Sequence, residues 1–163
     1  MRTRHAPGRY EIDTERSTVT FRTRHMFGLA PVRGTVAVRA GTIDLAEPAA
    51  ASSVQVEIDA ATFHTGNERR DENVRSARYL DVAHHPVMTF ASERVDGDAL
   101  VGTLTVRGVT RPVRLAIEEP EFDLAPLSFH ATTIIDRFAF GLTADRGMTG
   151  RHLHLDIRVI THA

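Results

Sequence analysis

The strongest constraint on the fold of this chain is an alternation of apolar and polar residues with period two, which fills most of its length. In Ser17–His25, for example, Val19 and Phe21 fall on one face of an extended chain, while Arg22 and Arg24 fall on the other. Such a segment needs apolar surroundings on one side of a sheet and water on the other. The pattern predicts about eight antiparallel strands, which are Ser17–His25, Val32–Ala40, Ser53–Asp59, Val87–Arg94, Ala99–Val106, Arg111–Glu118, Leu127–Arg137 and Arg151–Thr161.

Two all-β architectures accept this pattern, a two-sheet sandwich and an up-and-down barrel. Several of the segments are longer than an ordinary strand, as the tilted strands of a barrel need to be. We therefore expect an all-β protein, an extended, lipocalin-like antiparallel barrel. A barrel of about eight strands is either filled by its own side chains or holds one small ligand.

The alternation is interrupted once, between Thr62 and Ser92, by a charged segment that is suited to a helix. Thr65 and Glu68 have the spacing of a capping box, in which the hydroxyl and the carboxylate each accept a backbone N–H. We expect a short helical insertion near residues 67–76, placed on the barrel as a lid or plug.

Length and composition indicate one domain over residues 1–163, with residues 1–8 as a flexible tail. The formal net charge of −1 and the lack of long basic runs argue against a nucleic-acid partner. The chain contains no Cys, which excludes disulfides, Cys-zinc sites and thiol nucleophiles. No apolar run reaches the ~18 residues of a membrane span, and the N-terminus has no apolar signal region. A chain that begins at Met1 is therefore expected in the cytoplasm.

The inward faces of the predicted strands carry Val, Leu, Ile and Phe, some small residues, and no Asp, Glu or Arg. An apolar guest suits such an interior, because burial stabilises by roughly 0.8 kcal/mol per CH₂. A barrel packed solid by its own side chains fits the same pattern, since alternation alone does not show a cavity.

Short motifs follow one another in order from Tyr10 to Leu142 and suggest a family. They are Tyr10-x-Ile12-Asp13, Ser17-x-Val19-x-Phe21, Arg24-His25, Thr65-Gly66-Asn67, Arg70-Asp71, Leu80-Asp81-Val82, His85-Pro86, Thr89-Phe90, Gly102-x-Leu104-Thr105-Val106-x-Gly108-Val109-Thr110-Arg111-Pro112-Val113, Asp136-Arg137 and Phe140-Gly141-Leu142. By these motifs the chain resembles the YceI family of lipocalin-like proteins. The resemblance implies an extended antiparallel barrel with helices near its mouth, which binds long polyisoprenoid or similar amphiphilic lipids.

The chain departs from the family pattern in three respects. The family usually shows His and then Leu shortly after the Arg-Asp pair, where this chain has Asn73 and Val74. His85 stands where an aromatic residue usually precedes the Pro. Many members also carry a secretory signal, and this N-terminus does not resemble one.

We expect the chain to bind a polyisoprenoid or other long-chain amphiphilic lipid, as a carrier or storage protein without catalytic activity or cofactor. Transient membrane contact and a homodimer are compatible with this interpretation. The residues expected to line the ligand are Phe21, His25, Val36, Val38, Tyr79, Phe90, Leu104, Leu115, Phe129, Ile135 and Leu155.

Two groups of polar residues are candidates for a role at the barrel mouth. His25 ends an inward face and either bonds a ligand head group or a backbone carbonyl. Arg70 and Asp71 form either a polar gate over the cavity or a local contact that fixes the helix to the rim. Beside an Arg, Asp71 is expected to stay ionised.

Other functions remain as alternatives. An enzyme acting on a small apolar substrate would use His25 with a hydroxyl such as that of Thr23, and a filled, structural or stress-related barrel would act as a dimer. His152 and His154 share a solvent face, and we expect no metal site.

Overall fold

The protein is a closed antiparallel β-barrel with one short helix, as a computed structural model of residues 5–25, 30–118, 127–145 and 150–162 shows; the side chain of His25 is outside this description. The described residues form the strands β1 (Gly8–Glu11), β2 (Thr18–His25), β3 (Ala30–Leu45), β4 (Ser53–His64), β5 (Val87–Asp96), β6 (Ala99–Val106), β7 (Val109–Ile117), β8 (Ser128–Asp136) and β9 (His152–Ile160). They also form the helix α1 (Glu68–Arg75) and the 3-10 turns η1 (Ala49–Ala51) and η2 (Arg137–Phe140). The predicted barrel with a helical insertion is confirmed.

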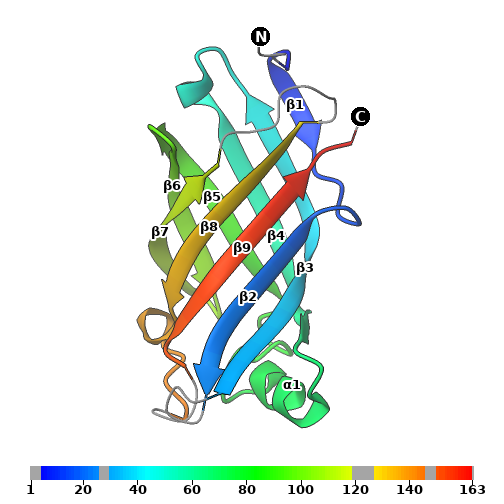
Figure 1. Cartoon of the computed structure of the whole chain (residues 1–163), viewed down its shortest axis with the longest axis vertical. Helices are drawn as coiled ribbons and strands as arrows, with labels where there is room; N and C mark the ends of the chain where they lie inside the picture. The colour runs from blue at the N-terminus through cyan, green and yellow to red at the C-terminus, as the bar shows by residue number, and fades with distance from the viewer. Residues whose placement is uncertain (1–4, 26–29, 119–126, 146–149, 163) are drawn as a thin grey trace.

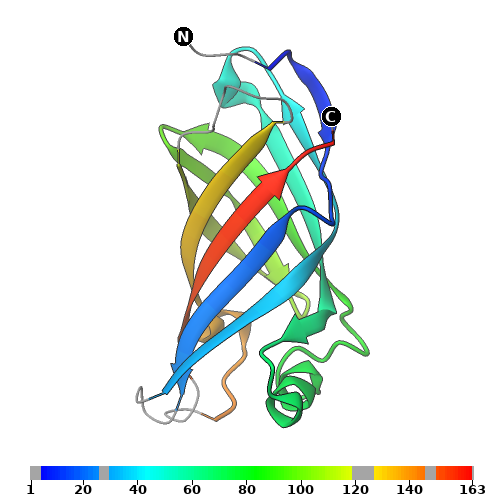
Figure 2. The same ribbon diagram turned by 45° about the vertical axis from the view of Figure 1, so that its right-hand side comes forward.

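The strands run in the order β1-β3-β2-β9-β8-β7-β6-β5-β4, and pairing of β3 with β4 closes the barrel. β1 is an addition to the eight strands of the barrel wall, because it pairs with the second half of β3 while β2 pairs with the first half. The strands are long and tilted, and α1 lies at the end of the barrel opposite β1 (Figures 1 and 2). Residues 1–4 of the predicted tail lie outside the described residues, and Gly8 already belongs to β1.

A bulge in β3 changes which residues of this strand face the interior. The register with β4 shifts between Val38 and Ala40. Val32 and Val38 are buried before the shift and Ile43 after it, so the inward positions change from even to odd numbers. An extra residue on one strand has this effect because side chains alternate between faces.

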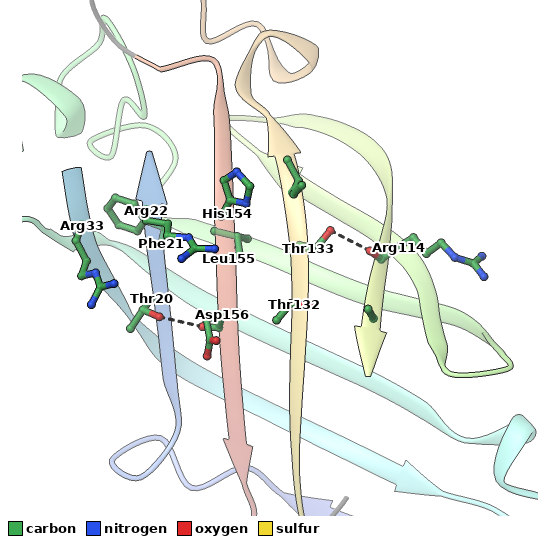
Figure 3. A pocket seen from close by; sticks show the side chains of 12 residues that line it. Thr20, Phe21, Arg22, Arg33, Arg114, Thr132, Thr133, His154, Leu155 and Asp156 are labelled. Atoms are coloured by element: carbon green, nitrogen blue, oxygen red, sulfur yellow. Dashed lines mark hydrogen bonds between the residues drawn. The ribbon is translucent and has the colours of Figure 1, made fainter. Parts of the chain in front are cut away.

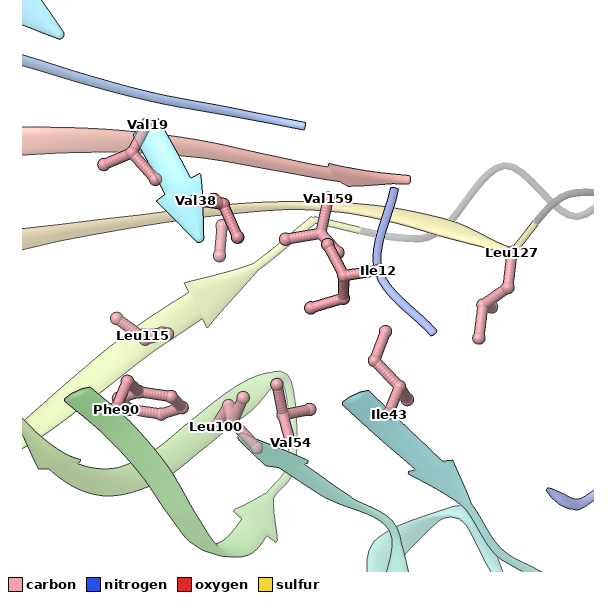
Figure 4. Close-up of a cluster of buried hydrophobic side chains, with 11 residues drawn as sticks. Ile12, Val19, Val38, Ile43, Val54, Phe90, Leu100, Leu115, Leu127 and Val159 are labelled. Atoms are coloured by element: carbon pink, nitrogen blue, oxygen red, sulfur yellow. The ribbon is translucent and has the colours of Figure 1, made fainter. Parts of the chain in front are cut away.

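The barrel interior contains two apolar clusters, one toward each end. The cluster at the β1 end is close-packed and buried, and it comprises Ile12, Val19, Val38, Ile43, Val54, Phe90, Leu100, Leu115, Leu127, Ala131 and Val159 (Figure 4). The cluster at the α1 end comprises Phe21, Phe63, Leu80, Val106, Phe140 and Leu142. Val36 and Leu104 pack against both clusters and mark the boundary between them.

The N-cap of the helix lies two residues later than the capping box predicts. Its N-cap is Asn67, whose side chain accepts the backbone N–H of Arg70 at 3.0 Å. Thr65 instead donates to Asp71, so the predicted pairing of Thr65 with Glu68 is wrong. An Asn satisfies a free N–H of the first turn as well as a Thr does, and here it lies at the position where the chain enters the helix.

The pairing between β7 and β8 is the shortest between neighbouring strands of the barrel wall. Among the described residues these strands pair only through Ala116 with Thr132 and through Ile117 with Ala131. On the outer face, the ring nitrogens Nδ1 and Nε2 of His130 each lie 2.8 Å from a carboxylate oxygen, of Glu118 and Asp156 respectively. Hydrogen bonds with Asp156 and then with Glu118 raise the pKa of His130 above its usual value, which favours the doubly protonated ring that ties the end of β7 to β8 and β9.

Candidate functional site

A cavity of about 240 Å³ occupies the α1 end of the barrel. Side chains from seven strands of the barrel form its wall, and α1 with the chain that follows it forms its roof. Nearly all of these side chains are apolar, and the described residues around the cavity include no Asp, Glu or His. Such a surface binds hydrocarbon by shape and by exclusion of water.

The structure divides the residues predicted to line a ligand into those around the cavity and those in the closed core. Phe21, Val36, Tyr79, Leu104, Ile135 and Leu155 surround the cavity. Val38, Phe90 and Leu115 lie in the buried cluster at the other end, and Phe129 packs against it. The side chain of His25 lies outside the described residues. Alternation identifies the inward face of a strand, but it does not distinguish the filled half of the barrel from the hollow one.

Of the part of the cavity that α1 supplies, the sequence analysis anticipated Arg70 but missed Asn73 and Val74. Arg70, Asn73 and Val74 line the cavity from above, and Leu80 follows from the turn after the helix. The first three are spaced i, i+3 and i+4, so they share one helix face. The sequence alone shows that these three residues share a face. It does not show that this face of the helix is directed into the barrel.

A buried carboxylate fixes the roof to the barrel. Asp71 is 2% exposed, and its oxygens accept the Thr65 backbone N–H at 3.0 and 3.1 Å and the Thr65 hydroxyl at 2.5 Å. Burial acts to raise the pKa of Asp71, but the bonds from Thr65, together with His64 and Arg75, outweigh it and lower the pKa below its usual value. The carboxylate is therefore ionised and serves as an anchor.

The Thr65 hydroxyl links this anchor to the cavity. It donates to Asp71 and accepts from Nε of Arg70 at 3.0 Å, which orients the guanidinium over the cavity. The two interpretations of the Arg70-Asp71 pair, a polar gate and a contact that fixes the helix, therefore apply to different residues. Asp71 fixes the helix to the rim, whereas Arg70 lies over the cavity.

A second guanidinium closes the side of the cavity. Arg137 is 4% exposed, and it donates through Nε to the carbonyl of Gly150 at 2.9 Å and through Nη1 to that of Leu142 at 2.6 Å. Its charge also lies 5.6 Å from the centre of the Tyr79 ring. The Tyr79 hydroxyl donates to Asp145 at 2.5 Å, and this bond, followed by one from Arg78, lowers the pKa of Asp145.

A larger hollow of about 710 Å³ lies on the outer face of the barrel, over β2, β8 and β9. Arg22, Arg33, His154 and Asp156 stand on this face (Figure 3). Half of the residues that line it are exposed, including Ile134 at 58%. Most of the residues around this hollow are polar or charged, whereas most of those around the smaller cavity are apolar, so the smaller cavity is the candidate site for a hydrocarbon chain.

Two further features of the described part of the chain concern metals and membranes. No three His, Asp or Glu side chains there converge as metal ligands would. No helix in that part combines the length and apolar character that crossing a bilayer requires.

The closed barrel, its apolar cavity and its helical roof define a class of protein, the small β-barrels with an apolar cavity at one end. The YceI-like domain matches residues 10–161, and the chain belongs to this family. It is 35% identical over 163 residues to a UPF0312 protein of Enterobacter sp. (strain 638), covering 92% of this chain and 84% of the relative. It is 33% identical over 162 residues to protein YceI of Salmonella arizonae, with the same coverage.

Solved structures share the fold at lower sequence identity. Burkholderia cenocepacia BcnA superimposes with a TM-score of 0.74 at 21% identity, covering 91% of this chain and 98% of that protein. A polyisoprenoid-binding domain from Saccharophagus degradans, implicated in plant cell wall breakdown, superimposes with a TM-score of 0.72 at 16% identity, covering 97% and 99%.

Proposed function

We propose that this protein binds a polyisoprenoid or other long-chain amphiphilic lipid in the cavity beneath α1, as a carrier or storage protein and not as an enzyme. The observation that carries the proposal is the apolar cavity at one end of a barrel whose other end is filled. The binding of polyisoprenoid by a structural neighbour supports the same ligand class.

The size of the cavity limits how much of a lipid it encloses. Its 240 Å³ is smaller than the ~300–1,000 Å³ of pockets that enclose a drug-sized ligand. We therefore propose that the cavity takes up one portion of a long chain, and that the remainder leaves through the mouth or displaces side chains at the boundary with the closed core.

The polar groups around the cavity support binding more than catalysis. An enzyme working through Thr23 needs a base at its hydroxyl, but this hydroxyl donates to the backbone carbonyl of His152 at 2.8 Å. The groups whose pKa is shifted, Asp71 and Asp145 among them, lie outside the cavity wall. Asp71 fixes the roof in place through Thr65, and Asp145 fixes the adjoining loop through Tyr79 and Arg78.

Native mass spectrometry of the freshly purified protein tests whether a ligand is bound. We expect an excess mass that disappears on denaturation, together with a long-chain lipid in an organic extract of the same sample. The delipidated protein is then titrated with farnesol, a prenyl alcohol.

A matched pair of variants locates the binding site. Leu104→Trp fills the cavity, whereas Ile134→Trp adds the same ring on the outer face. We expect Leu104→Trp to lose at least about tenfold in farnesol affinity, which is ~1.4 kcal/mol, and Ile134→Trp to lose none. Equal binding by both variants, or no binding by the unaltered protein, would contradict the proposal.

A further inference from the structure

We infer that the outer face of the barrel over β2, β3, β8 and β9 docks on an anionic lipid bilayer, where Arg22 and Arg33 bind lipid phosphates and Ile134 enters the layer beneath them. This goes beyond the proposed function, because the surface lies outside the barrel and does not depend on a ligand in the cavity. The partner is a membrane with negatively charged head groups.

Four side chains form one row across this face. Arg22 on β2 lies directly opposite Arg33 on β3 and, on its other side, opposite His154 on β9. His154 in turn lies opposite Ile134 on β8. Residues paired in this way point to the same side of a sheet, and all four are exposed. The row crosses the outer hollow of about 710 Å³ (Figure 3).

The two arginines of the row lack a counter-charge. Neither Arg22 nor Arg33 has an ion pair or a side-chain hydrogen bond with any residue that the structure describes. Like charges directly opposite each other on adjacent strands are destabilising. β2 contains no Asp or Glu, and the only one in β3 is Asp44, near the far end of that strand. Asp156 on β9 already accepts Nε2 of His130 at 2.8 Å. An external anion between the two guanidiniums would therefore relieve their repulsion.

The chemistry of the row fits a lipid surface better than other anionic partners. The N–H groups of a guanidinium match two oxygens of a phosphate. Ile134 is 58% exposed and is the one large apolar side chain that the described part of the chain exposes to this degree. It lies at the end of the row, where it enters the apolar layer of a bilayer while the arginines stay at the phosphates. The phosphate backbone of a nucleic acid offers no such apolar layer.

The distribution of charge favours one orientation of the barrel on the membrane. The whole chain has a formal net charge of −1, so the arginines of this face are balanced by carboxylates elsewhere. The strands β4 and β5 carry four of these carboxylates, of Glu57, Asp59, Glu93 and Asp96. Attraction to an anionic membrane therefore requires that the face with Arg22 and Arg33 is turned toward the lipid.

Sedimentation with lipid vesicles tests the docking. We expect the protein to bind vesicles of equal parts phosphatidylglycerol and phosphatidylcholine but not vesicles of phosphatidylcholine alone, and to be released in about 0.5 M NaCl, which screens surface charges. Each basic residue near an anionic surface contributes roughly fivefold, so Arg22→Gln/Arg33→Gln should weaken vesicle binding about 25-fold. Arg16→Gln/Arg94→Gln is the matched control, because it makes the same change in net charge at exposed positions outside the row.

Fluorescence identifies the face that meets the lipid, because the chain contains no Trp of its own. Ile134→Trp places a single indole in the row. Ala91→Trp places one at an exposed position on β5, which is four strands from β9 in either direction around the barrel. We expect anionic vesicles to shift the emission of Ile134→Trp to shorter wavelength and to leave that of Ala91→Trp unchanged.

Several results would overturn the inference. They are equal binding to neutral and anionic vesicles, an equal loss in the two double variants, emission shifts of equal size, and no binding to anionic vesicles. If poly-glutamate binds where anionic vesicles do not, the face belongs to an acidic protein partner instead. None of these variants changes a residue around the cavity, so each should bind farnesol like the unaltered protein. That measurement shows that the variants are folded and tests the proposed function separately.

Discussion

Asp71 is the residue on which the roof of the cavity depends most, and Asp71→Ala tests this dependence. The substitution removes the acceptor of two donors, the backbone N–H and the hydroxyl of Thr65. A hydrogen bond to a charged group contributes about 1.5–3 kcal/mol, so the loss of two predicts destabilisation by about 3–6 kcal/mol. For a chain of 163 residues this corresponds to a fall in melting temperature of roughly 6–24 °C.

The free energy of unfolding is measured by urea titration with far-UV circular dichroism as the signal, since the chain contains no Trp. Glu72→Ala is the control, because Glu72 is the next residue of α1 and is exposed. It should change stability by no more than about 0.5 kcal/mol. A double-mutant cycle of Asp71→Ala with Thr65→Val should give a coupling energy of about 0.5–3 kcal/mol. Equal effects of Asp71→Ala and Glu72→Ala, or strict additivity in the cycle, would refute the reasoning.

The cost of Asp71→Ala should also depend on pH. The folded protein lowers the pKa of Asp71, so the carboxylate contributes its full stabilisation above the ordinary Asp pKa of about 3.9. This contribution is lost as the pH falls through the lower value of the folded state. The difference in unfolding free energy between Asp71→Ala and the unaltered protein should therefore be constant near neutral pH and shrink in acid.

Three further outcomes follow from the packing. Gly34→Ala should destabilise by about 1–3 kcal/mol in urea titration, because a Cβ there would lie 2.3 Å from the Phe21 ring; an unchanged midpoint would contradict this. The flanking carboxylates raise the pKa of His130, so the stabilisation that its charged ring contributes should be complete below about pH 6.5 and fade as the pH rises through the pKa of the folded state. His130→Gln should remove this pH dependence of the unfolding free energy. A variant that retains the pH dependence would show that His130 is not its source. Phe90→Ala should destabilise the protein by about 3–5 kcal/mol and join space in the closed core to the cavity. We therefore expect the variant to bind longer prenyl alcohols more tightly. An unchanged preference for chain length would show that Phe90 does not limit the length of the bound chain.

Most of the wall of this barrel was predictable because period two fixes both the strands and their inward faces. Val36, Leu104 and Leu155 face the interior as expected, and the resemblance to the YceI family implied the correct fold. The sequence pattern did not reveal how the interior is divided. Phe90 and Leu104 are paired across β5 and β6 and both face inward, yet Phe90 belongs to the closed core while Leu104 borders the cavity. That difference depends on the position of a residue along the barrel axis and on its neighbours from other strands.

The roof was harder to predict, because its polar residues could satisfy one another in more than one way. Thr65 fits a capping box with Glu68 as well as it fits the observed bond to Asp71. The observed arrangement depends on the burial of Asp71, which favours the partner that brings both an N–H and an O–H to one carboxylate. Burial of this kind is a property of the folded barrel and is not encoded in local spacing.

The polar inner face of α1 explains why the barrel is hollow at one end. The closed end is filled by large apolar side chains, and an apolar residue at position 70 or 73 would extend this packing into the cavity. Arg70 and Asn73 do not replace such a residue, because moving a guanidinium or an amide into an apolar interior costs several kcal/mol unless every polar group finds a partner. Val74 is the only apolar residue of α1, it already lines the cavity, and it is too small to fill the space. The cavity thus persists because its roof is polar and is fixed to the barrel by the bonds between Asp71 and Thr65.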